Sequence, residues 1–485
     1  MKGRFTMAKF DESLEFSKKN SWQTMNDETR AEVFDFCEGY KTFLNESKTE
    51  RESVDSAVKL LSENGFTEFG KLLDGSVKAE PGTKFYYVHR NRSLFIAVLG
   101  QKAPDAGFKL VGAHIDCPRL DIKPSPFIED SNLVYLKTHY YGGVKKYQWL
   151  TIPLALHGVV IKKDGTALKV AIGEKCGDPK FMISDLLPHL GGAQLNKPAH
   201  AVVDAEQLNV IIGSVPGKEC AKDEKAEDDE KAFTVKQNIL TYLFNEYGIS
   251  EKDFARAELM AVPAAKATDI GFDRGLIGAY GHDDRVCAYT ELRAIMELDK
   301  IPERTAVCYF ADKEEIGSVG NTGARSDALG YFVSEVCSLY TANDTMLMAK
   351  RCLNASKMLS ADVTAAYDPT FADVYDKTNA AFLGHGIAIE KYTGARGKSG
   401  TSDAPCEFVF EVTDSLDEEG IAWQINEMGK IDAGGGGTIA QFMADKGIEV
   451  LDCGVALFNM HAPMELASKA DIYWAYRAYK NFLNK

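Results

Sequence analysis

Short apolar runs alternate with amphipathic stretches over much of the chain, and this alternation predicts the fold class. Buried strands are expected at 108–116 (FKLVGAHID), 305–311 (TAVCYFA), 358–366 (MLSADVTAA) and 448–457 (IEVLDCGVAL). Apolar residues at helical spacing predict helices within 11–64 and at 285–298, 325–340 and 470–483. Alternating strands and helices are typical of an α/β fold, so we expect a mixed, mostly parallel sheet sandwiched by helices.

The middle of the chain has a different pattern. From about 122 to 262, short β runs such as DGTALKVAIG (164–173) and LNVIIGSVPG (208–217) are punctuated by glycine and aspartate. The charged run KDEKAEDDEKAF (222–233) is expected to be a solvated loop, the alternative being a functional charge patch. We therefore expect a β-rich domain at 122–262, inserted into an α/β domain made of 1–121 and 263–485.

Composition argues against several classes of partner. The chain has 56 Lys and Arg against 71 Asp and Glu, and its net charge of −15 argues against nucleic acid or an anionic membrane. The longest weakly polar stretch, 149–161, is too short to cross a bilayer, and the N-terminus has no apolar segment of signal-peptide type. The ten cysteines occur without a C-x-x-C pair, which favours reduced thiols and a cytoplasmic location.

Histidines and acids lie at or just after the ends of expected strands. Two histidines, aspartates able to bridge two cations and a glutamate pair are the ligand types of a two-zinc hydrolase. They are His114 and Asp116 in VGAHIDCPR, Asp283 in GHDDRV, Glu314 and Glu315 in DKEEIGS, Asp362 in LSADVT, and His461 in LFNMHAP. Open α/β sheets place their ligands at the carboxyl ends of their strands, where the glutamate pair is expected.

The first two motifs also have structural explanations. His114 and Asp116 are two residues apart on an extended segment, so Asp116 can orient the imidazole while the other ring nitrogen binds metal, but an H-x-D pair also arises by chance. An aspartate at a strand-to-helix turn can bridge two cations or cap the helix. We expect Asp283 to bind metal and Asp284 to cap or support the helix.

The remaining motifs are more specific when taken together. Glu314 and Glu315 diverge at a turn after a strand, so one can bind metal while the other takes a proton from water as general base. A solvated acid pair is the alternative. His461 alone is equally typical of a buried structural histidine, but ligand-type residues in five such segments are hard to obtain by accident.

The motifs VGAHIDCPRLDIKPSP, GHDDR, DKEEIGS, LSADV and NMHAPMELA, in this order, resemble the aspartyl aminopeptidase/aminopeptidase I family of two-zinc metallo-exopeptidases. The resemblance covers nearly the whole chain, and YTGARGKSGTSDAP (392–405) is similar to the bacterial branch. It implies the two-zinc exopeptidase fold, with two zinc ions per subunit for which cobalt or manganese can substitute. It also implies a homo-oligomer, up to a tetrahedral dodecamer, assembled partly through the inserted domain, whose strands otherwise leave exposed edges.

The resemblance also implies a role for each candidate residue. Asp283 bridges the two ions. His114 and Asp362 hold one ion, and Glu315 and His461 hold the other. Glu314 is the general base, and Asp116 orients His114.

We therefore expect a metal-dependent aminopeptidase that uses zinc-activated water to release one N-terminal residue, acidic or neutral, from peptides with a free N-terminus. One alternative is a related two-metal carboxypeptidase or N-acyl-amino-acid deacylase. Those enzymes need a basic clamp for a substrate carboxylate, and no arginine is obviously placed for it. The other alternative is a catalytically silent scaffold of the same fold.

Release of an acidic residue requires a cation in the pocket that binds its side chain, because a buried carboxylate without a partner is energetically costly. Three cations lie in IEKYTGARGKSG, namely Lys391, Arg396 and Lys398. We expect Lys391, directly after the strand-like IAIE, to point inward and bind substrate, with the other two facing solvent or a neighbouring subunit. The alternative is that all three are solvated loop charges.

Overall fold

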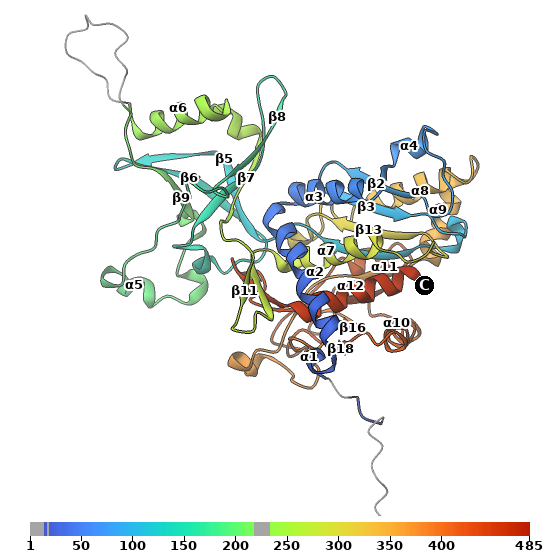
Figure 1. Cartoon of the computed structure of the whole chain (residues 1–485). Helices are drawn as coiled ribbons and strands as arrows, with labels where there is room; N and C mark the ends of the chain where they lie inside the picture. The colour runs from blue at the N-terminus through green and yellow to red at the C-terminus, as the bar shows by residue number, and fades with distance from the viewer. Residues whose placement is uncertain (1–13, 17–18, 218–232) are drawn as a thin grey trace, which may run out of the picture.

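The computed structural model describes residues 14–16, 19–217 and 233–485. Most of the charged run 222–233, and residues 11–13 and 17–18 of the expected helical region, lie outside the described residues. Two lobes are visible in Figure 1, one built on a large sheet between helices and one built on a smaller antiparallel sheet. No helix in the described part of the chain is long and apolar enough to cross a membrane.

A mixed sheet of nine strands forms the centre of the larger lobe. Its order is β1 (Thr67–Glu68), β2 (Lys84–His89), β3 (Ser93–Val98), β13 (Ala306–Ala311), β4 (Lys109–His114), β14 (Lys357–Ser360), β20 (Glu449–Gly454), β16 (Ile387–Glu390) and β18 (Trp423–Ile425). Strands β13, β4, β14 and β20 run parallel in the middle of the sheet, whereas β2–β3, β3–β13 and β20–β16 pair antiparallel. The expectation of a mixed, mostly parallel sheet is confirmed.

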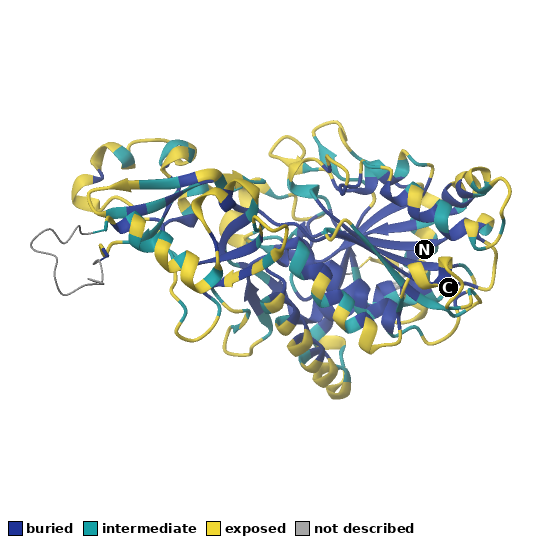
Figure 2. Cartoon of the chain, turned by 90° about the horizontal axis from the view of Figure 1, so that it is seen from above, coloured by how far each residue is buried: buried dark blue, intermediate teal, exposed yellow. Residues whose placement is uncertain are grey.

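Helices cover both faces of this sheet because its strands are apolar on both sides. Leu94 and Ile96 of β3 belong to one core cluster, and Phe95 and Ala97 belong to another. The first cluster includes α2 (Asp27–Glu46), α3 (Glu50–Glu63), α7 (His282–Met296), α10 (Cys406–Glu418) and α12 (Lys469–Asn484). The second includes α4 (Gly70–Leu73), α8 (Ala328–Ser338), α9 (Thr345–Ala355) and α11 (Ala440–Ala444). Figure 2 shows the buried strands between them.

The smaller lobe is an antiparallel sheet of six strands. Its order is β8 (Ala167–Ile172), β7 (Leu154–Ile161), β10 (Ala257–Pro263), β5 (Arg119–Asp130), β6 (Leu133–Tyr141) and β9 (Asn209–Gly213). It has its own apolar core, which includes Trp149 and Val210. Two helices accompany it, α5 (Gly192–Leu195) and α6 (Val235–Tyr247). We did not expect α6 in this β-rich block.

The structure contains a third sheet that the sequence did not reveal. It has five short strands in the order β11 (Thr268–Ile270), β12 (Leu276–Ala279), β22 (Glu465–Ser468), β21 (Ala456–Phe458) and β15 (Thr364–Ala365). The remaining elements are α1 (Ser21–Thr24) and a two-stranded ribbon of β17 (Gly394–Ala395) and β19 (Gly435–Gly436). The third sheet matters for function because two candidate ligands follow its strands.

Candidate metal centre

Three neighbouring parallel strands bring four of the candidate residues to one edge of the central sheet. His114 is the last residue of β4, and Asp362 comes two residues after β14. Glu314 and Glu315 lie in a short 3-10 helix, η8 (Glu314–Ile316), that follows β13. Strand β4 pairs with β13 on one side and with β14 on the other, so these side chains converge at the carboxyl end of the sheet.

The other two candidate ligands come from the five-stranded sheet. Asp283 lies in the first turn of α7, which follows β12, and the Asp283–Asp284 peptide bond is cis. His461 lies three residues after β21, with a left-handed backbone. Glu465 on β22 links the two segments, since its carboxylate accepts the backbone N–H groups of His461 at 2.7 Å and of Asp283 at 3.1 Å. No role was expected for Glu465 from the sequence.

Asp283 lies between the two histidines. Its Oδ1 is 3.1 Å from Nε2 of His114, and its Oδ2 is 3.1 Å from Nε2 of His461. The same ring nitrogens face the other acids, with His114 3.7 Å from Asp362 Oδ1 and His461 3.4 Å from Glu315 Oε2. The five residues therefore form one cluster, with His114 and Asp362 at one end, Glu315 and His461 at the other, and Asp283 between.

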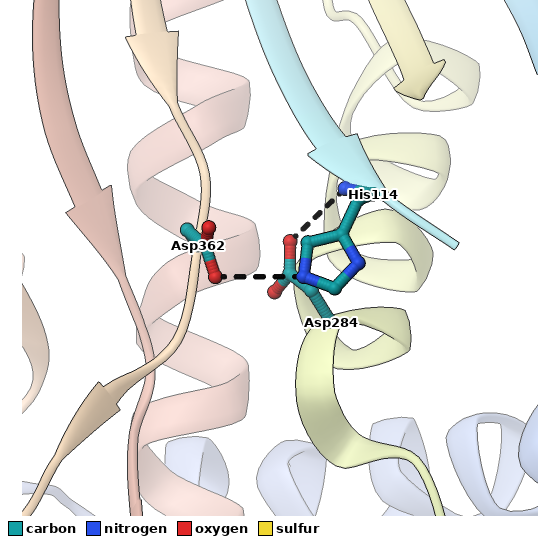
Figure 3. Close-up of side chains that lie close together, drawn as sticks. All are labelled: His114, Asp284 and Asp362. Carbon is teal, nitrogen blue, oxygen red and sulfur yellow. Dashed lines mark hydrogen bonds and ion pairs between the residues drawn. The ribbon is translucent and has the colours of Figure 1, made fainter. Parts of the chain in front are cut away.

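Asp284 supports the cluster from behind. Its Oδ2 accepts the backbone N–H of His114 at 3.3 Å, and Figure 3 shows this carboxylate beside the His114 ring, with Asp362 opposite. The N-cap of α7 is Gly281, so of the two roles expected for Asp284 the structure favours support. Its carboxylate is also close enough to His114 and Asp362 for the three to surround a cation.

Asp116 contacts His114 differently from what we expected. The nearest partner of His114 Nδ1 is the backbone carbonyl of Asp116 at 2.9 Å, and the carboxylate Oδ1 is farther away at 3.4 Å. The fully buried carboxylate accepts the backbone N–H groups of Glu314 at 3.1 Å and of Glu315 at 3.3 Å. It also accepts a hydrogen bond from the hydroxyl of Tyr141 at 2.8 Å. No role was expected for Tyr141 from the sequence. Asp116 thus orients the glutamate pair as well as His114.

Burial and crowding of like charges shift the pKa values of the acids. Burial is the main cause that raises the pKa of Glu314 to about 7, and burial together with neighbouring acids raises those of Glu315 and Asp362 well above the usual range. Burial acts in the same direction on Asp283, but hydrogen bonds from His114 and His461 outweigh it and lower the pKa of Asp283.

A divalent cation fits this donor set. Burial lowers the pKa of His461, but Asp283 and Glu315 more than compensate and raise it to about 10. A bound cation would reverse these shifts by favouring neutral imidazoles and ionised carboxylates. Moreover, Oε1 of Glu315 is buried and has no hydrogen-bond partner among the described residues, which is unfavourable unless another group binds it. Imidazole nitrogens and carboxylate oxygens are the ligands that zinc accepts in catalytic sites.

Lys391, the candidate substrate-binding residue, follows a strand as expected, but its side chain does not point inward. Lys391 directly follows β16, and its side chain is exposed, whereas we expected it to point inward. Lys398 lies over the ring of Tyr392 at 3.7 Å and pairs with Asp403 at 3.2 Å. These contacts give Lys398 a local structural role.

Imidazoles and carboxylates that converge at the carboxyl edge of an α/β sheet are typical of a metal-dependent hydrolase, and comparison with known proteins shows the family. The family model described as aminopeptidase I zinc metalloprotease (M18) matches residues 43–483. The chain therefore belongs to the M18 family of zinc aminopeptidases, and its activity is that of a metal-dependent aminopeptidase. This finding favours exopeptidase action at the N-terminus over the carboxypeptidase, deacylase and silent-scaffold alternatives.

Similar proteins cover almost the whole chain. A probable M18 family aminopeptidase 1 from Clostridium acetobutylicum is 46% identical over 466 residues, which are 96% of this chain and 98% of the relative. The crystal structure of an M18 aminopeptidase from Thermotoga maritima, 42% identical, has a TM-score of 0.89 and covers 97% of this chain and 100% of its own. The mApe1 dodecamer of Saccharomyces cerevisiae, 20% identical, has a TM-score of 0.73 over 93% of this chain and 95% of its own, which shows the same fold.

Proposed function

We propose that this aminopeptidase works with two zinc ions per chain, with Asp283 binding both. The observation that carries the proposal is the placement of the two Asp283 oxygens, each 3.1 Å from the Nε2 of a different histidine. His114 and Asp362 would hold one ion, and Glu315 and His461 the other, with cobalt or manganese as substitutes. When bound, zinc acts as a Lewis acid that makes water more acidic and polarises a nearby carbonyl.

Glu314 is the proposed general base. It takes a proton from the attacking water and delivers it to the leaving amine nitrogen as the peptide C–N bond breaks. The carboxylate of Asp116 accepts the backbone N–H of Glu314. This hydrogen bond fixes the backbone position from which the Glu314 side chain extends. Oε2 of Glu315 lies 3.4 Å from Nε2 of His461, which supports Glu315 as the metal ligand of the pair.

The proposed substrates are peptides with a free N-terminus whose first residue is acidic or neutral. Lys391 is the proposed cation for an acidic side chain because it directly follows β16, although β16 runs antiparallel to β20 and so ends away from the carboxyl edge that carries the candidate ligands. The proposed compartment is the cytoplasm, supported by the nine cysteines in the described ranges, all of which are free thiols.

A homo-oligomer, up to a tetrahedral dodecamer, is also proposed, with the block 122–262 as an inserted domain that contributes to assembly. Its support is the dodecameric mApe1 relative and a set of exposed apolar side chains on this block. They are Met182, Leu186, Leu187, Leu190, Leu195, Val215, Tyr242 and Phe244. Apolar side chains exposed together on one surface are typical of an interaction site.

The bridging role of Asp283 is tested by metal analysis of two neighbouring variants. Asp283→Asn removes one charged oxygen from the position between the histidines, so we expect it to lower the occupancy of both ions. Asp284→Asn is the matched control, because an amide oxygen can still accept the N–H of His114, and it should keep two equivalents of zinc. Two full equivalents in Asp283→Asn would contradict the bridge.

A further inference from the structure

The loop that leaves the six-stranded sheet touches the candidate metal centre. Strand β6 ends at Tyr141, and Gly142 and Gly143 follow. We refer to Tyr141, Gly142 and Gly143 as the Tyr-Gly-Gly turn. Tyr141 and Gly143 each form a hydrogen bond with a different member of the centre, and Gly142 lies beside a third, although the turn belongs to the lobe that lies beside the central sheet.

Tyr141 holds the carboxylate of Asp116. Its hydroxyl donates to Asp116 Oδ2 at 2.8 Å, and its ring lies 4.0 Å from the guanidinium of Arg119. Arg119 is itself fixed by Glu50 at 3.2 Å and Asp121 at 2.8 Å. A fully buried carboxylate needs all of its donors, and Asp116 has the two glutamate N–H groups and this hydroxyl around it. The hydroxyl therefore helps to determine where the glutamate pair lies.

Gly143 sets the orientation of the His461 ring. Its carbonyl lies 2.9 Å from Nδ1 of His461, and a carbonyl can only accept, so Nδ1 carries the proton of this hydrogen bond. The lone pair of a neutral ring is then on Nε2, the nitrogen that faces Asp283 and Glu315. This backbone contact fixes both the tautomer and the direction of the proposed ligand.

Both glycines are needed for this close approach. Gly142 has a φ of +74°, and a Cβ there would lie 3.2 Å from Oε2 of Glu315. A Cβ on Gly143 would lie 3.0 Å from Nδ1 of His461, which is closer than side chains normally pack. A larger residue at either position would push on a proposed ligand.

We propose that the Tyr-Gly-Gly turn is a positioning element of the metal centre. Tyr141 acts through Asp116 on Glu314 and Glu315, and Gly143 acts on His461. The six-stranded lobe therefore contributes to the catalytic centre of its own chain, in addition to any role in assembly. This inference rests on the metal and base roles proposed above.

The test compares Tyr141→Phe with Tyr140→Phe. Tyr141→Phe keeps the ring on Arg119 and removes only the hydroxyl, whereas Tyr140 is exposed on the opposite side of the same strand. Loss of a group that supports metal ligands typically costs about 10–100-fold in metal affinity or activity. We expect Tyr141→Phe to retain zinc about tenfold less well against a chelator and to lower kcat by a similar factor with KM nearly unchanged. Tyr140→Phe should match the wild type.

A second pair of variants tests the backbone contact. Gly143→Ala should weaken zinc retention at the ion held by His461, whereas Gly192→Ala, in the same lobe with open space around its Cβ, should not. Equal zinc retention and equal kcat in Tyr141→Phe and Tyr140→Phe would overturn the inference, even if Gly143→Ala fails to fold. A wild-type protein that binds a single zinc ion would instead contradict the proposed two-ion function. That result would leave the inference about the turn intact, because the inference depends only on comparing each variant with its control.

Discussion

Lys391 is the proposed cation for an acidic N-terminal side chain, and its exposure limits the size of the effect that it can have. An exposed ion pair contributes about 1 kcal/mol or less, which corresponds to roughly fivefold in kcat/KM. We therefore expect Lys391→Ala to lower kcat/KM for an N-terminal aspartate by up to about fivefold and to leave leucine unchanged. Lys398→Ala, whose partners are Tyr392 and Asp403, is the control. Equal losses on both substrates would leave a preference for neutral residues as the better description.

Single residues show why part of the centre was predictable. His114, Glu315 and Asp362 follow apolar runs that had to be strands, so parallel pairing alone brought them together. Tyr141 gave no such signal. Its hydrogen bond to Asp116 connects two lobes, and a contact of this kind leaves no periodic pattern in the sequence. Glu465 was equally hidden, since its role is to accept backbone N–H groups.

At the scale of elements, β16 and β20 place two acids side by side inside the sheet. Glu390 and Asp452 are buried partners in this antiparallel pair. Burial is the main cause that raises the pKa of Glu390 to about 7, and the charge of Asp452 adds to it, while Thr364 and Asn426 donate hydrogen bonds that lower it. An acid whose pKa is higher in the folded than in the unfolded protein binds its proton more tightly in the folded state. Deprotonation at higher pH therefore destabilises the fold.

Glu390 should therefore make stability fall as pH rises. The unfolded carboxyl loses its proton near pH 4.5 and the folded one near pH 7, so stability decreases across this window and stays lower above it. The cost is on the order of 3 kcal/mol by the usual free energy per pKa unit. Glu390→Gln keeps an acceptor for Thr364 and Asn426, and its Tm should fall less than that of the wild type between pH 5 and pH 8. Identical Tm losses would contradict the assignment.

Element length decided which elements were predictable. Five of the nine strands of the central sheet have six residues, and the expected helices at 285–298, 325–340 and 470–483 correspond to α7, α8 and α12. The five-stranded sheet has strands of only two to four residues, too short to show a period. Helix α6 follows a run of strands and has a single buried residue, Val235, so it carries little of the apolar stripe that marks a helix.

At the scale of the whole molecule, the apolar side chains exposed on the six-stranded lobe predict association. The protomer has a mass of 53.3 kDa, and we expect light scattering to show a much larger, single species. Leu195→Asp on α5, where the side chain is 73% exposed, should reduce that mass because a charge would be buried in an apolar contact. Tyr331→Asp, on α8 of the other lobe, is the control. A stable, active protomer in the wild type would contradict the proposed assembly.

The central claim is that Glu314 carries the proton while Glu315 binds metal, and one measurement separates these roles. We expect Glu314→Gln to keep wild-type zinc content and lose roughly 10²–10⁴-fold in kcat, the usual contribution of a general base. Glu315→Gln, the neighbouring control, should lose zinc. Near wild-type kcat in Glu314→Gln, together with full zinc content in Glu315→Gln, would contradict the account.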